Sequence, residues 1–356
     1  MKKQLLWITL ASMSACGEEK RGPTWAPPED AIFAAVEEEG ALAALDGASG
    51  ALLAKVDLSQ EHVKFDVHNV QAAPDRKTVW LTAMPAEGGE HAAHGGGALA
   101  EQLIGVDVGS LAVRDRIELG TGLHAAHVVV AGTTAYVTAF DADAVVVVDL
   151  AAKRVTGRIA LPAGTGPHGA RLTPDAKLLV VAGMKTGALV IVDITSGKVD
   201  SYPMPGRAVQ AAVLPAGDRA FVSVYDTRQI ASIDLATREI KLIDLPAGAA
   251  GPVQIYPAPD GRGLWVADQG MLDGQAAGDK LYRIDPASSS VTLTARVNQA
   301  PHGVVVNEDG SKAWTTTLVD GTAQSVDTRT GAVLSTSNVG TKPNGISCLH
   351  ASGAMP

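Results

Sequence analysis

One short pattern recurs along most of this chain and limits its possible folds more than any other feature. An aliphatic residue followed by Asp ends an apolar run and precedes a polar turn and a second run with strand character. Asp and the Ser or Thr of such a turn can bond the turn's own backbone, so each copy predicts a β-hairpin. The copies are Val106-Asp107, Val148-Asp149, Val192-Asp193, Ile233-Asp234, Ile284-Asp285 and Val326-Asp327, and consecutive copies lie 41 to 51 residues apart.

A second element recurs out of phase with the first. It opens with Pro-His-Gly or a variant, continues as an apolar strand and ends in Pro-Asp or a similar pair. The openings contain His68, His127, His168, Val209, Val253, His302 and Asn344, which we place at one equivalent point of the repeat. Between the turns lie strand-forming triplets, namely Trp80-Leu81-Thr82, Tyr136-Val137-Thr138, Phe221-Val222-Ser223 and Trp265-Val266-Ala267.

Taken together, these elements resemble the YVTN family of propeller repeats over roughly residues 30–350. The resemblance implies an all-β fold, a seven-bladed β-propeller with four-stranded antiparallel blades. A period of about 40–45 residues suits one blade of four short strands. The ring is expected to close by pairing N-terminal strands with a C-terminal inner strand, which removes exposed sheet edges.

The N-terminal part of the repeat requires a choice between two candidate turns. Asp46 lies 22 residues before His68 and is followed by better turn chemistry than Asp57, so we take Asp46 as the hairpin residue. Strands are then expected near 31–36, 41–45 and 51–57, with one inner strand after Pro343. The Ala and Glu content of 31–45 favours a helix by propensity alone, but the repeat requires strands there, and we predict strands.

The first residues have the features of an export signal. Lys2 and Lys3 precede an apolar stretch, residues 5–12, that is too short to span a bilayer. The following Met13-Ser14-Ala15-Cys16 resembles the lipobox of bacterial lipoproteins, which implies cleavage before Cys16 and acylation of that residue. We therefore predict a lipoprotein signal peptide (1–15), a lipid-anchored flexible tether (16–29) and the propeller (30–356). The expected location is extracytoplasmic, at the periplasmic face of the membrane or at the outer membrane.

The charge and the cysteine content exclude several classes of partner and site. The formal net charge is −9 and no basic cluster is present, which argues against nucleic acid as a partner. If Cys16 is acylated, Cys348 is the one remaining thiol, so an internal disulfide and a Cys-rich zinc site are both excluded. The expected partners are the membrane, through the lipid anchor only, and a protein or cell-envelope component.

The histidines are the candidate functional residues. In an antiparallel blade the inner strands all begin on one face, so their first residues should surround the mouth of the central channel. The predicted metal ligands are His68, His127, His168 and His302, with His91 and His94 from the insertion 85–100. Asn344, Gln210 and Gln254 are the expected polar neighbours at the channel mouth. Several imidazoles favour copper or zinc over Mg²⁺ or Ca²⁺.

Two other functions are compatible with the same residues. The Pro-His-Gly opening is a common variant of this repeat, and its His can simply bond a neighbouring loop, which leaves an interaction platform without metal. Streptogramin lyases share a Pro-His-x-Ile opening and pair it with a Glu after the second strand. Here Glu37–Glu39, Asp141 and Asp268 fall nearby, so a propeller-type lyase or lactonase is the other alternative. The sequence assigns no catalytic residue.

Overall fold

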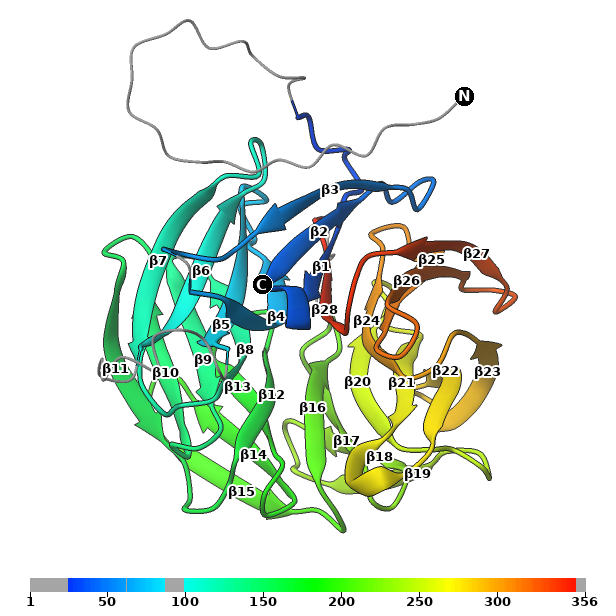
Figure 1. Ribbon diagram of the computed structural model, residues 1–356. Coiled ribbons are helices and arrows are strands. Elements are labelled where there is room, and N and C mark those ends of the chain that lie inside the picture. The colour runs from blue at the N-terminus through cyan, green and yellow to red at the C-terminus, as the bar shows by residue number, and fades with distance from the viewer. Residues whose placement is uncertain (1–24, 62, 87–98, 350–356) are drawn as a thin grey trace, which may run out of the picture.

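The computed structural model describes residues 25–61, 63–86 and 99–349. Seven four-stranded antiparallel sheets stand around a central axis, which confirms the predicted seven-bladed β-propeller (Figure 1). Helical structure in these ranges is confined to two single turns, η1 (Glu37–Glu39) and η3 (Leu272–Gly274). Across the part of the chain that the structure describes, no helical segment has the length and apolar character that crossing a bilayer requires.

Each blade has an inner, a second, a third and an outer strand, counted from the axis outward. The inner strands are β4 (Phe65–Ala72), β8 (Ala125–Ala131), β12 (Pro167–Leu172), β16 (Ala208–Val213), β20 (Pro252–Pro257), β24 (Pro301–Val306) and β28 (Pro343–Cys348). The second strands are β5 (Thr78–Pro85), β9 (Thr134–Ala139), β13 (Leu178–Gly183), β17 (Arg219–Val224), β21 (Leu264–Gly270), β25 (Lys312–Thr317) and β1 (Ile32–Val36).

The third and outer strands complete the blades in the same order. The third strands are β6 (Glu101–Asp107), β10 (Ala144–Asp149), β14 (Ala188–Asp193), β18 (Gln229–Asp234), β22 (Ala277–Asp285), β26 (Thr322–Asp327) and β2 (Ala41–Leu45). The outer strands are β7 (Val113–Gly120), β11 (Arg154–Ala160), β15 (Val199–Pro203), β19 (Ile240–Asp244), β23 (Ser290–Arg296), β27 (Val333–Asn338) and β3 (Leu52–Asp57).

The seventh sheet combines both ends of the described chain. Its strand order is β28-β1-β2-β3, and β28 also contacts the inner strands β24 and β4 on either side. The segment 31–45 forms the strands β1 and β2 separated by η1, as the repeat required and against its helix propensity. Asp46 accepts hydrogen bonds from the backbone N–H and the hydroxyl of Ser49, so the turn lies where its chemistry predicted.

The apolar core lies between blades. Strands buried on both faces are rich in Val, Ile and Ala because each sheet is covered by its two neighbours, whereas outer strands such as β11 are largely exposed. One buried cluster, for example, joins Val180 of β13 to Val213 of β16 and Val222 of β17. Each fully buried side chain of this size contributes about 1.5–3 kcal/mol, so the packed blade faces hold the ring rigid around the axis.

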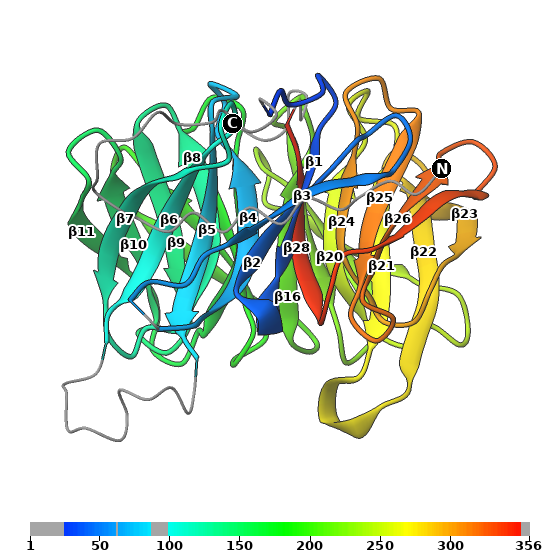
Figure 2. The ribbon, with the colours of Figure 1, turned by 45° about the horizontal axis from the view of Figure 1, so that its top comes forward.

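The Asp of each aliphatic-Asp copy stabilises its hairpin as predicted. Its Oδ1 accepts hydrogen bonds from backbone N–H groups two or three residues on, as Asp193 does from Thr195 and Ser196. The longest spacing between copies arises because β21 and β22 are joined through η3. Figure 2 shows this connection and η1 on the same side of the propeller disc (the mouth face, on which the inner strands begin).

Every inner strand shifts register against its neighbouring strand at a pair of consecutive residues. These pairs are His68-Asn69, Ala126-His127, His168-Gly169, Val209-Gln210, Val253-Gln254, His302-Gly303 and Asn344-Gly345. Such bulges re-aim side chains. In this propeller they place the histidines and polar residues of the mouth face.

In four blades a hydroxyl on the second strand joins two bulges. The hydroxyl accepts the N–H of the second bulge residue of its own blade and donates to the carbonyl of the first bulge residue of the next blade. The hydroxyls belong to Thr82, Thr138, Ser223 and Thr316. The same position is Ala35, Ala182 or Ala267 in the other three blades. We call each such pair of hydrogen bonds a clasp. The clasps fix neighbouring inner strands relative to one another.

Candidate functional site

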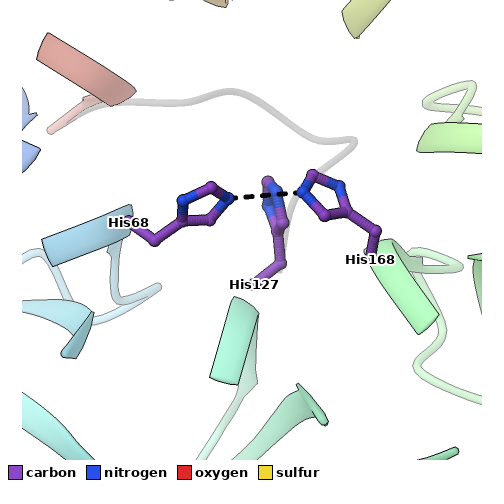
Figure 3. A group of neighbouring side chains, drawn as sticks. All are labelled: His68, His127 and His168. Carbon is purple, nitrogen blue, oxygen red and sulfur yellow. Dashed lines mark hydrogen bonds between the residues drawn. The ribbon is translucent and has the colours of Figure 1, made fainter. Parts of the chain in front are cut away.

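Three histidines from different blades meet inside the ring of inner strands (the His triad: His68 of β4, His127 of β8 and His168 of β12). Nε2 of His68 lies 3.3 Å from Nε2 of His168. One ring nitrogen from each residue lies within 4.8 Å of the other two. Figure 3 shows His68 and His168 facing each other, with His127 reaching in between them. The triad therefore spans three adjacent blades.

Ring-to-ring distances place His68 at the centre of a larger histidine group. Its ring centroid lies 5.4 Å from that of His168, 5.6 Å from that of His127 and 6.3 Å from that of His302. The centroids of His127 and His168 are 4.8 Å apart. β4 and β24 are inner strands of blades separated by the β28 blade, so His68 and His302 approach each other through the channel.

Burial keeps these imidazoles uncharged. It lowers the pKa of His68 to about 4 and that of His168 to about 3, with smaller effects from neighbouring histidines. It also holds the pKa values of His127 and His302 well below the usual value for histidine. Neutral imidazole is the form that binds metal ions. Near neutral pH each of the four side chains therefore carries a lone pair on one of its ring nitrogens.

Hydrogen bonds at Nδ1 set the orientation of the His168 and His68 rings. Nδ1 of His168 donates to the carbonyl of Val209, 2.9 Å away, which leaves Nε2 as the nitrogen with the lone pair. Nδ2 of Asn344 donates to Nδ1 of His68 at 3.1 Å and to Oε2 of Glu37 at 2.6 Å. Contacts of this kind orient histidines that bind metals.

His127 lies between two glutamines, and the single lone pair of its neutral ring can accept from the amide of one of them. Nε2 of Gln210 lies 3.4 Å from Nδ1 of His127, and Nε2 of Gln254 lies 3.4 Å from Nε2 of His127. Gln210 also donates to Oε1 of Gln254 at 2.6 Å. The three buried side chains form one network across the β8, β16 and β20 blades.

Two buried polar atoms beside the triad have no partner among the described residues. Nδ1 of His302 hydrogen-bonds Oε1 of Gln269, but Nε2 of His302 is unpaired, and so is Oδ1 of Asn344. Leaving such an atom unpaired costs about 1–3 kcal/mol. A ligand in the channel mouth would supply the missing partners.

Two carboxylates lie on the mouth face near His68. Glu37 lies in η1, and burial raises its pKa, an effect opposed by Asn344 and Lys342. Burial also raises the pKa of Asp66, helped by the charge of Glu37. When ionised, such groups attract cations. The same raised pKa makes Glu37 a candidate proton donor.

One pair of triad nitrogens has the spacing expected for tetrahedral metal coordination. Two nitrogens bound to zinc at about 2.0–2.1 Å lie about 3.3–3.4 Å apart in a tetrahedral site. The 3.3 Å between Nε2 of His68 and Nε2 of His168 has this value. Three imidazoles would leave a fourth position for water, a substrate or the unpaired nitrogen of His302. Such a donor set suits zinc or copper.

The structure corrects one assignment made from the sequence. His127 was placed at the same repeat position as His68 and His168, but the clasps show that Ala126 occupies it. The hydroxyl of Thr82 donates to the carbonyl of Ala126, as that of Thr138 does to His168. His127 lies one residue further along, at the position of Asn69 and Gln210, because Ala125-Ala126-His127 lacks the Pro that marks the position of His168 and His302 in their copies.

Other sequence predictions lie outside the described residues. These are His91, His94 and Cys16, together with the signal peptide and most of the tether. Two groups at the site were not assigned a contact with the histidines from the sequence: Gln269, which ends β21, and Glu37 of η1. Their position on the mouth face follows from the repeat, but Gln269 contacts His302 in the next blade, and Glu37 contacts Asn344 from the other end of the chain within one blade.

Comparisons with known structures agree with this fold. The periplasmic gluconolactonase PpgL of Pseudomonas aeruginosa is 16% identical, with a TM-score of 0.69 over 92% of this chain and 99% of its own. Virginiamycin B lyase from Staphylococcus aureus is 15% identical, with a TM-score of 0.64 over 83% of this chain and 94% of its own. At these identities the likeness shows the fold alone.

A third similar structure matches this chain over only part of its own length. Hydrazine synthase of Kuenenia stuttgartiensis is 21% identical, with a TM-score of 0.52 over 59% of this chain, and the match spans 64% of that protein's chain. No curated protein matches this chain.

The family assignment comes from the repeats themselves. A family model described as YNCE-like beta-propeller matches residues 107–312, which is more than half of the chain. The matched region begins at Asp107, the Asp of the first well-formed hairpin copy, and ends in β25. The chain therefore belongs to the YNCE-like β-propeller family.

Proposed function

We propose that this protein is an extracytoplasmic, membrane-tethered binding protein whose His triad holds one transition-metal ion, copper or zinc, at the mouth of the propeller channel. The observation that supports this most is the convergence of three neutral imidazoles from three blades, with ring nitrogens within 4.8 Å of one another. Neither zinc nor copper needs an acidic ligand when several imidazoles are present.

The surrounding residues have separate roles in this proposal. His168 binds through Nε2, and the Val209 carbonyl orients its ring. His68 binds through Nε2 in the tautomer that carries the proton on Nδ1, for which the Asn344 amide turns so that its unpaired Oδ1 accepts that proton. Gln210 and Gln254 hold His127. His302 is the fourth candidate ligand within the described residues, and His91 and His94 of the insertion are further candidates. The carboxylates of Glu37 and Asp66 attract the cation to the mouth.

Metal content of protein purified without a polyhistidine tag tests the proposal. After incubation with Cu²⁺ or Zn²⁺ and removal of free ion, elemental analysis should find one ion per chain. His168→Ala should reduce affinity by more than the roughly 10- to 100-fold that loss of an outer orienting partner costs. His124→Ala is the matched control, because His124 lies on the mouth face, is exposed and pairs with Asp141 outside the triad.

Two results would contradict the metal proposal. One is a folded wild-type protein that retains no stoichiometric copper or zinc. The other is equal metal content in the His168→Ala and His124→Ala variants. Circular dichroism of both variants establishes that the propeller is intact before the metal is measured.

The membrane tether is tested separately. Acylation of Cys16 predicts that the protein sediments with membranes and that its N-terminal peptide carries the mass of acyl chains. Cys16→Ser should release it into the soluble extracytoplasmic fraction. Equal distribution of the wild type and the variant would contradict the tether without affecting the metal proposal.

A second candidate function is acid–base catalysis by Glu37. Burial raises the pKa of Glu37, and Asn344 connects it to His68, so a proton donor and an imidazole lie together. Structures with the same fold include a gluconolactonase and a virginiamycin B lyase. Turnover of a gluconolactone or of virginiamycin B by protein stripped with EDTA, lost in Glu37→Gln, would favour this function. Absence of both metal and turnover would leave an interaction platform.

A further inference from the structure

A second set of equivalent residues lies further along the inner strands than the His triad, away from the mouth face. It comprises the residue two positions after the second bulge residue of each inner strand: Gln71, Val129, Arg171, Ala212, Tyr256, Val305 and Ser347. The set holds one cation, Arg171, and no acidic residue. The bulge residues above it also include no Asp or Glu.

Arg171 is a buried charge without a counterion. It is 6% exposed, and its Nη1 donates a hydrogen bond to the carbonyl of its neighbour Ala170 at 2.7 Å. Its Nε is buried and unpaired, and no carboxylate of the described chain forms an ion pair with it. A buried charge without a counterion is destabilising, which is why removing one partner of a buried ion pair is costly.

Tyr256 supplies an unpaired donor at the same depth. It is 2% exposed, and its hydroxyl has no partner among the described residues. Burial raises the pKa of Tyr256 far above neutral pH, and burial does the same for the pKa of the nearby Cys348 thiol. Burial lowers the pKa of Arg171 to about 10, so Arg171 stays positively charged. Neither the phenol nor the thiol can neutralise it.

Arg171 and Tyr256 occupy the same repeat position in two blades that have one blade between them. Arg171 belongs to β12 and Tyr256 to β20, and the blade between them contributes only Ala212 at this depth. Arg171 nevertheless interacts electrostatically with Tyr256, and also with His127 of the triad above. Ala212 has a small apolar side chain, so Arg171 and Tyr256 are the polar residues of these three blades at this depth.

We propose that Arg171 and Tyr256 form a second binding site in the channel, which takes the oxyanion group, a carboxylate or a phosphate, of a small molecule. Guanidinium N–H groups and a phenol O–H are donors, and a planar guanidinium binds such oxyanions through two parallel hydrogen bonds. The bound oxyanion would neutralise Arg171 and pair both unsatisfied donors. The site does not depend on a metal at the His triad.

Anion-dependent stability of EDTA-treated protein tests this site. Phosphate and acetate are titrated separately against chloride at constant ionic strength. One of the oxyanions should raise the Tm of the wild type in a saturable way, by roughly 2–4 °C at high occupancy. Arg171→Met should abolish the response, and Tyr256→Phe should weaken binding several-fold. Arg116→Met is the matched control, because Arg116 is partly buried but fully paired with Gln102, Leu58 and Ser59.

The oxyanion with the lower dissociation constant identifies the group that the site prefers. Three outcomes overturn the proposal: no saturable response of the wild type to either oxyanion, an equal response to chloride, or parallel responses in the wild type and Arg171→Met. If Arg171→Met does not fold, calorimetric titration of the wild type and Tyr256→Phe decides. Equal affinities in that pair would also overturn it.

Discussion

The hydroxyl of Thr138 donates a hydrogen bond to the carbonyl of His168 in the next blade, 2.6 Å away, and accepts the N–H of His127 in its own blade at 2.9 Å. One side chain thus fixes the backbone of two members of the triad relative to each other. The interaction uses the Thr of the repeated Tyr-Val-Thr triplet, so a residue of the repeat motif also positions the site.

Thr138→Val should therefore damage both stability and the site. It removes the hydroxyl with little change of shape, leaves a buried N–H and a buried carbonyl unpaired, and should lower the free energy of unfolding by about 1–3 kcal/mol. We expect the metal affinity to fall by roughly 10- to 100-fold, as for other orienting partners. Urea denaturation and competitive metal titration measure the two effects.

Ser223→Ala is the control for that experiment. Ser223 makes the equivalent clasp between Gln210 and Val253, neither of which belongs to the triad. It should cost similar stability with a smaller loss of metal affinity. If both variants lose affinity equally, the effect of Thr138 is one of general stability and not of positioning.

Gly169 is required by the approach of the next blade. A Cβ on Gly169 would lie 2.6 Å from Cα of Gln210, a backbone atom that cannot rotate away. Gly169→Ala should push β12 from β16, lower the free energy of unfolding by about 1–3 kcal/mol as overpacking does, and displace His168. Gly157→Ala in β11, where a Cβ meets nothing within 4 Å, is the control. Equal thermal midpoints for the two variants would contradict this explanation of the Pro-His-Gly motif.

The fold was predictable because each of its signals is local. The Asp of each hairpin bonds its own turn, and the strands carry the aliphatic residues of a sheet buried on both faces, so the repeat reports the blade directly. The helix propensity of 31–45 was overridden because β1 and β2 are covered on both sides by other strands. Propensity differences of a few tenths of a kcal/mol per residue are small beside that burial.

The site was predictable only in part. The repeat places His68, His168 and His302 at the start of inner strands, and closure of the ring brings such residues together. The contact of Gln269 with His302 joins two blades, and that of Glu37 with Asn344 joins the two ends of the chain within one blade. They depend on side-chain directions at bulges, which no spacing reveals. The same reason explains why Arg171 and Tyr256 were not recognised from the sequence.

Asn344 is expected to orient His68 rather than to bind the metal. Asn344→Leu removes the donor to Nδ1 of His68 and the link to Glu37. Metal affinity should fall by roughly 10- to 100-fold, while the metal-to-protein ratio at saturation stays at one. Asn307→Leu is the control, since Asn307 bonds only its own turn on the opposite side of the disc. Loss of stoichiometry in Asn344→Leu would indicate that Asn344 is itself a ligand.

The hairpin aspartates should make the propeller sensitive to acid. Hydrogen bonds from Ser196 and Thr195 lower the pKa of Asp193, with help from Lys198, and hydrogen bonds from Thr173 and Lys177 lower the pKa of Asp175 to about 2. A carboxyl group whose pKa is lower in the folded state stabilises the fold above its unfolded pKa of about 3.9. That stability is lost as the pH falls through the folded value, here between about pH 4 and pH 2.

Asp193→Asn tests this with little change of shape, because Asn can also accept the turn's N–H groups. The variant should be less stable than the wild type at pH 7. The difference should shrink as the pH falls below 4 and vanish near the pKa of the folded carboxyl group, because the wild-type side chain is then neutral as well. Urea midpoints of EDTA-treated protein at a series of pH values measure the difference. A difference that stayed constant from pH 7 to pH 2 would show that the charge of Asp193 does not stabilise the turn.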